Sequence, residues 1–252
     1  EATRQWLNRI EQQYVHTQPI LTPRFIPSCT DQLMEMLHVI RHEYHLPVQS
    51  HLSENQGEIA WVRELCPNAK HYGDAYHHFG LFGGPGCPTI MAHCVYSEGD
   101  ELELMKQQQV FVAHCPASNT NLSSGIAPVR RFLQQGVPVG LGSDVAGGTH
   151  TSIFRAMADA IQVSKLRWRL VDDSLAPLTA AEAFHLGTAG GGAFFGKVGS
   201  FLPGYEFDAL VINDSRYTPS GTLSIMERLE RSIYLADERD FQYKFVQGRQ
   251  IF

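Results

Sequence analysis

Short apolar segments that end in polar residues alternate with amphipathic segments along most of this chain. Strand-like character is found at residues 18–27, 46–51, 88–93, 110–116 and 137–144. Helical spacing of apolar residues follows at about residues 30–44, 53–65, 97–108, 150–168 and 179–195. Strands that alternate with helices are typical of a parallel sheet. The sequence therefore predicts an α/β fold with about five βα units of a (β/α)8 barrel.

The pattern changes after Gly196. Two later segments, 198–213 and 241–252, alternate apolar and polar residues between glycine-containing turns, which is typical of antiparallel strands. We therefore expect a partial barrel that carries the catalytic groups over residues 1–195, and a small C-terminal β-sandwich portion over residues 196–252.

Composition excludes several classes of protein. Of the 252 residues, 43% are hydrophobic and 18% are charged, and the formal net charge is −6. These values are typical of a globular domain with a small-molecule ligand, and they argue against nucleic acid as a partner. The sequence contains no apolar stretch of membrane-spanning length. Five scattered cysteines without a CxxC pair suggest reduced thiols, so we expect a cytoplasmic protein without a membrane partner.

Ionisable residues follow several of these apolar segments. His51 ends one of them and Glu54 lies three residues further on, so both side chains could face one water molecule. A metal ion on His51 would acidify that water while Glu54 accepts its proton. Taken alone, Glu54 could equally be a helix N-terminal acid. His93 and Asp144 end two further segments, and a buried carboxylate such as Asp144 is most simply explained by a cation.

Arg24 and Phe25 lie in a proline-rich extended segment and are candidates for substrate contact. An arginine beside an aromatic ring could donate hydrogen bonds to a flat heterocycle while that heterocycle packs on the ring. The alternative is a surface arginine next to a core phenylalanine.

These segments together resemble one enzyme family. The motifs PRF at 23–25, QSHLSEN at 49–55, MAHC at 91–94, AHCPASNTNLSSG at 113–125 and GLGSDVAGG at 140–148 are similar to those of guanine deaminases in the amidohydrolase superfamily. The resemblance extends over nearly the whole chain and implies zinc-dependent hydrolysis of guanine to xanthine and ammonia, with one zinc ion or another divalent metal.

The resemblance also implies a role for each matching residue. His51 and Asp144 would bind the metal, Glu54 would shuttle protons, His93 would orient the attacking hydroxide, and Arg24 and Phe25 would hold guanine. The family's HxH metal-binding pair does not occur in these residues, although a catalytic zinc usually has three protein ligands. We therefore expect a homodimer, or association with an N-terminal portion that carries the pair.

Two other functions fit the same residues. One is a deaminase or chlorohydrolase of the same branch that acts on another amino-heterocycle. The other is a non-catalytic purine-binding module that lacks full metal coordination.

Overall fold

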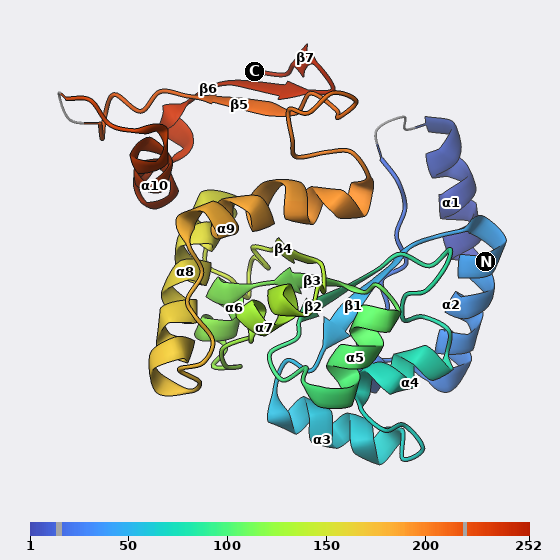
Figure 1. Cartoon of the computed structure of the whole chain (residues 1–252). Coiled ribbons are helices and arrows are strands. Elements are labelled where there is room, and N and C mark those ends of the chain that lie inside the picture. The colour runs from blue at the N-terminus through green and yellow to red at the C-terminus, as the bar shows by residue number, and fades with distance from the viewer. Residues whose placement is uncertain (14–16, 219–220) are drawn as a thin grey trace. The chain divides into compact units, whose positions relative to one another are not determined.

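The computed structural model describes residues 1–13, 17–218 and 221–252. The chain comprises two compact units, Glu1–Phe111 and Val112–Phe252. In Figure 1 the colour runs along the chain from blue in the first unit to red at the end of the second. Parallel strands and helices alternate along the chain, so the expected α/β class is confirmed. The expected boundary between residues 195 and 196 stays a prediction.

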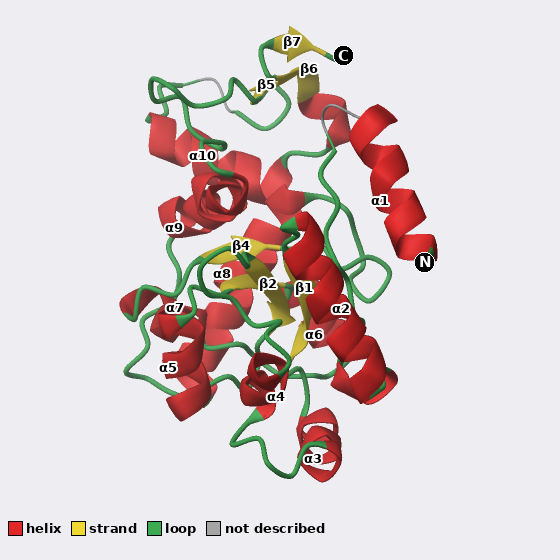
Figure 2. Cartoon of the chain, turned by 90° about the vertical axis from the view of Figure 1, so that its right-hand side faces the viewer, coloured by secondary structure: helices red, strands yellow, loops and turns green. Residues whose placement is uncertain are grey.

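Two parallel strands, β1 (Val48–Leu52) and β2 (Thr89–His93), lie at the centre of the first unit. Leu52 is paired with His93, so the two strands end side by side. Both strands alternate buried and half-buried residues, because successive side chains point to opposite faces. The helices of this unit are α1 (Ala2–Gln13), α2 (Asp31–Tyr44), α3 (Gln56–Leu65), α4 (Tyr72–His78) and α5 (Gly99–Gln107). Figure 2 shows these helices in red and the strands in yellow.

The expected strand at residues 18–27 is much shorter in the structure. Leu21 forms an isolated parallel bridge with Val48, and a 3-10 turn follows at Ile26–Ser28. Prolines lack the amide N–H that a strand ladder requires, so this proline-rich segment cannot extend the pairing. The segment nevertheless stays beside β1, and this places Arg24 and Phe25 near the end of that strand.

Capping side chains fix where the helices of this unit begin. Thr30 accepts the amide hydrogen of Leu33 at the start of α2. The helix expected from about residue 53 begins only at Gln56, because Asn55 accepts the amide hydrogen of Glu58 and acts as its N-cap. Glu54 therefore lies in the loop between β1 and α3 rather than in the first helical turn.

The second unit contains the parallel strands β3 (Phe111–His114), which starts at the junction of the units, and β4 (Val139–Leu141). Its helices before residue 200 are α6 (Pro116–Asn121), α7 (Val129–Gln134), α8 (Ile153–Leu170) and α9 (Ala180–His185), which continues into a π-helical turn at Leu186–Gly190 and a 3-10 turn at Ala193–Phe195. The strand expected to run to residue 144 ends at Leu141, so Asp144 lies in the following loop.

The C-terminal part of this unit forms an antiparallel sheet, as its alternating pattern indicates. Its strands are β5 (Ala209–Ile212), β6 (Phe241–Val246) and β7 (Arg249–Gln250), which lie side by side in Figure 1. Helix α10 (Ile225–Leu235) precedes β6 and was not expected. Its signal was present in the sequence, because Ser224 and Glu227 form a capping box. Among the helices of the described residues, none is both long and apolar enough to cross a membrane.

Candidate functional site

Three of the residues singled out in the sequence meet where β1 and β2 end. The rings of His51 and His93 are stacked, with centroids 5.3 Å apart and planes inclined by 24°. The Glu54 Oε2 atom lies 3.7 Å from His93 Nε2. His93 is 1% exposed, whereas the Glu54 side chain is 15% exposed. The structure therefore places one carboxylate and two imidazoles together, with the carboxylate accessible from solvent.

The backbone of Arg24 fixes the orientation of His51. The His51 Nδ1 atom lies 2.5 Å from the carbonyl oxygen of Arg24. Because a carbonyl oxygen can only accept, Nδ1 carries a proton, so in the neutral ring Nε2 is the nitrogen with the lone pair. An imidazole held by a backbone carbonyl in this way is typical of metal-binding histidines, because the hydrogen bond fixes the tautomer and the orientation of the ring.

Arg24 and Phe25 also have their side chains at this site. The Arg24 guanidinium carbon lies 5.3 Å from the centre of the Phe25 ring. That ring contacts the His51 ring edge-on, with centroids 6.4 Å apart. Arg24 is exposed and Phe25 is half-buried. An exposed donor group and a half-buried aromatic ring therefore lie beside His51, and both kinds of group are used to bind a flat polar heterocycle.

Two buried hydroxyl groups, which no sequence pattern indicated, hold residues 23–24 against the end of β1. The Ser50 Oγ atom lies 2.8 Å from the Pro23 carbonyl oxygen, 3.1 Å from that of Arg24 and 2.7 Å from Tyr76 Oη. The Tyr76 hydroxyl lies 2.9 Å from the carbonyl oxygen of His51. These bonds tie residues 23–24 to the end of β1. Tyr76 comes from α4, a helix that the sequence pattern did not indicate.

We expect Tyr76→Phe to lower the free energy of unfolding by about 1–3 kcal/mol, because it leaves buried polar partners with one bond fewer. Denaturant unfolding measures this effect. Tyr44→Phe is the matched control, since the Tyr44 hydroxyl makes a long contact of 3.5 Å with exposed Asn8. Equal effects of the two substitutions would contradict the assigned role of Tyr76.

A second carboxylate, Glu58, lies buried near Glu54. Burial raises the pKa of the Glu58 carboxyl; the hydrogen bond from Tyr72 opposes this shift, and the charge of Glu54 adds to it. The Tyr72 hydroxyl donates to Glu58 Oε1 at 2.6 Å. Burial also raises the pKa of the Tyr72 hydroxyl, so it remains a donor at neutral pH. Glu58 is thus held inside the unit, and Glu54 is the more accessible of the two carboxyls.

Asp144 belongs to the second unit and is described within it. It is half-buried and has a positive φ of 45°. The amide of Gly148 donates to its carbonyl oxygen at 2.6 Å, and the amide side chain of Asn121 donates to the carbonyl oxygen of Gly147 at 2.8 Å. A tight loop therefore presents Asp144, instead of the strand end that the sequence suggested.

The donor chemistry of this site fits a metal ion in part. His51 offers Nε2 in the orientation of a ligand. No group of three or more histidine, cysteine or acidic side chains arranged to hold a metal is found within residues 1–13, 17–218 and 221–252. A three-ligand site thus requires more donors than the arrangement around His51 supplies. The metal-binding roles of His51 and Asp144 stay predictions.

Comparison with known proteins agrees with the motifs. The Amidohydrolase family model matches residues 4–251. The chain is 40% identical to guanine deaminase from Dictyostelium discoideum over 241 residues, which cover 93% of this chain and 53% of that protein. The resemblance to guanine deaminases is thus confirmed. The chain spans about half the length of the curated relatives it matches.

Solved structures show the same likeness. Guanine deaminase from C. acetobutylicum, with guanine bound in its active site, is 47% identical, with a TM-score of 0.94 over 99% of this chain and 59% of that one. An adenosine deaminase from Xanthomonas campestris, with bound zinc, shares the fold at 20% identity and a TM-score of 0.84, over 99% of this chain and 55% of that one. Because the Amidohydrolase family model matches residues 4–251, the chain belongs to the amidohydrolase family.

Proposed function

We propose that the protein that carries this chain hydrolyses guanine to xanthine and ammonia with the help of a zinc ion. The observation that carries this proposal is the grouping of Arg24 and Phe25 against His51, with Glu54 facing His93. The likeness to a deaminase with guanine in its active site supports the choice of substrate.

Guanine is flat and carries a carbonyl oxygen and ring nitrogens that accept hydrogen bonds. The exposed Arg24 guanidinium would donate to these atoms, and the half-buried Phe25 ring would pack against the heterocycle. The guanidinium stays charged throughout the physiological pH range. The two side chains therefore bind and orient the base next to His51.

His51 and Asp144 would hold the metal, together with donors from another polypeptide segment. When bound, zinc lowers the pKa of water so that hydroxide is available near neutral pH. His51 contributes Nε2 because the Arg24 carbonyl holds the proton on Nδ1. The Arg24 carbonyl thus connects Arg24, which would bind guanine, directly to His51, which would bind the metal.

Glu54 would move the protons of the reaction. It accepts one proton from water as the oxygen bonds to the purine carbon that carries the amino group, and it delivers this proton to the adjacent ring nitrogen. A second proton passes from the new hydroxyl through Glu54 to the amino group, and ammonia leaves as the carbon–nitrogen bond breaks. A carboxylate can act as base and then as acid in this way. His93, 3.7 Å from Glu54, would orient the attacking oxygen.

The proposal is tested on the chain purified with any polypeptide that accompanies it. We expect stoichiometric zinc by metal analysis and release of ammonia from guanine. Faster turnover of an adenosine derivative or an s-triazine would identify another deaminase or chlorohydrolase of the branch. Guanine binding without zinc and without ammonia would instead identify a purine-binding module.

Arg24→Ala should raise the KM for guanine by about 10- to 100-fold, the effect of losing a hydrogen bond from a charged group. Steady-state ammonia release measures the change. Arg9→Ala, at an exposed position of α1, is the control and should leave the KM unchanged. If Arg24→Ala kept the wild-type KM, Arg24 would not contact guanine.

A further inference from the structure

The backbone turns into the left-handed region where both strands of the first unit end. Ser53 follows β1 with a φ of 45°, and His93 and Cys94 at the end of β2 have φ values of 73° and 50°. Residues other than glycine adopt this conformation only when the surrounding structure holds them in it. Glu54 is the next residue after Ser53, so the conformation of Ser53 decides where the Glu54 side chain begins.

Specific hydrogen bonds hold Ser53 in this conformation. Its hydroxyl donates to Glu101 Oε2 at 2.8 Å, and its carbonyl oxygen accepts the amide hydrogen of Tyr96 at 3.0 Å. The other carboxylate oxygen of Glu101 accepts the amide hydrogen of Gly73 at 2.8 Å. Ser53 is 2% exposed and Glu101 is 5% exposed. The buried carboxyl of Glu101 is thus held by hydrogen bonds from two other segments, the loop after β1 and helix α4.

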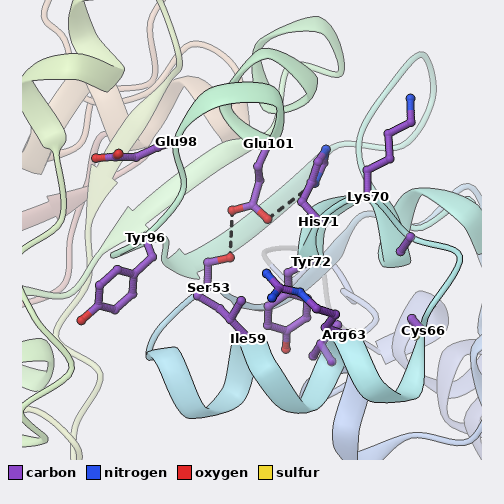
Figure 3. A pocket seen from close by; sticks show the side chains of 12 residues that line it. Ser53, Ile59, Arg63, Cys66, Lys70, His71, Tyr72, Tyr96, Glu98 and Glu101 are labelled. Carbon is purple, nitrogen blue, oxygen red and sulfur yellow. Dashed lines mark hydrogen bonds and ion pairs between the residues drawn. The ribbon is translucent and has the colours of Figure 1, made fainter.

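Ser53 and Glu101 both line a cavity of about 130 Å³. Figure 3 shows their side chains pointing toward each other, with a dashed line for the hydrogen bond between them. His71 lies on the other side of Glu101, with Nδ1 3.7 Å from Oε1. The same Nδ1 accepts the amide hydrogen of Asp74, so a neutral His71 ring does not donate to Glu101 from this atom. The Ser53 hydroxyl is therefore the side-chain group that donates a hydrogen bond to the Glu101 carboxyl.

We propose that Glu101, acting through Ser53, is a positioning residue for Glu54. The inference rests on the proposed function, because it gives Glu54 the task of moving protons. Loss of the hydrogen bond between Ser53 and Glu101 lets Ser53 relax toward a negative φ, and this redirects the Glu54 side chain away from His93. Misplacement of a proton-transferring group by about 1 Å lowers turnover by up to about 100-fold, whereas guanine binding through Arg24 is unaffected.

Substitutions at Ser53 separate this role from simple packing. Ser53→Ala loses the bond and keeps the cost of the left-handed backbone, so we expect kcat to fall by about 10- to 100-fold with KM within about twofold. Ser53→Gly also loses the bond, but glycine adopts a positive φ at little cost, so it should retain more kcat than Ser53→Ala. Glu101→Gln, which keeps a hydrogen-bonding group of the same length, should retain more kcat than Glu101→Leu.

Amide hydrogen exchange gives a readout that does not depend on activity. In Ser53→Ala, the Tyr96 amide should exchange at least about 10-fold faster than in the wild type, because its acceptor moves. If the wild type released no ammonia but Tyr96 exchange rose, the proposed function would fail and the positioning device would stand. Unchanged Tyr96 exchange, wild-type kcat in Ser53→Ala, or equal kcat in Ser53→Ala and Ser53→Gly would overturn the inference.

Discussion

Glu54→Gln is expected to lower kcat for guanine deamination by about 10²- to 10⁴-fold, the range for removal of a general acid–base group. The amide has almost the same shape as the carboxylate but cannot accept a proton at neutral pH. The site contains a second carboxyl, Glu58, but this group is buried and bonded to Tyr72. Because Glu58 is less exposed than Glu54, we do not expect it to take over the proton transfer.

Binding should survive this substitution. Arg24, Phe25 and His51 are untouched, so we expect the affinity for guanine, measured by calorimetry, to stay within about threefold of the wild type. Glu64→Gln is a matched control on the exposed surface of α3 and should leave kcat unchanged. Wild-type kcat in Glu54→Gln would show that another group transfers the proton.

The sequence was sufficient to predict the grouping of His51, Glu54 and His93 because parallel strands end at the same edge of a sheet. His51 and His93 each end an apolar segment, and Glu54 follows the first segment by three residues. The register of β1 and β2 then brings the rings of His51 and His93 into contact. A short-range pattern thus became a tertiary contact through strand pairing alone. The roles assigned to these residues stay predictions until tested by activity.

The supporting residues could not be predicted from the same pattern. Ser50, Tyr76 and Glu101 act through contacts between segments 26 to 48 residues apart, and such contacts leave no periodicity in the sequence. Helix α4 begins at an unusual cap, the ring of His71, in place of the serine, threonine, aspartate or asparagine that usually marks a helix start. The fourth parallel strand was expected to end at Asp144 but ends three residues earlier, at Leu141, and a tight loop carries Asp144.

That loop is the basis of the second large effect that we expect. A Cβ atom at Gly148 would lie 2.0 Å from the carbonyl oxygen of Ser143, and backbone atoms cannot yield cheaply. Gly148→Ala should therefore open the turn that the Gly148 amide closes on Asp144. We expect the free energy of unfolding to fall by about 1–3 kcal/mol, as for other overpacked sites, and zinc affinity to fall by about 10- to 100-fold through displacement of Asp144.

Chelator competition measures the zinc affinity, and denaturant unfolding measures the stability. Gly221→Ala is the control, because a Cβ at Gly221 meets no atom of residues 1–13, 17–218 and 221–252 within 4 Å. Loss of stability together with wild-type zinc affinity would mean that the loop is strained but that Asp144 does not bind the metal. Loss of both, with an unchanged Gly221→Ala variant, would support a metal ion at Asp144 that depends on the closure of this turn.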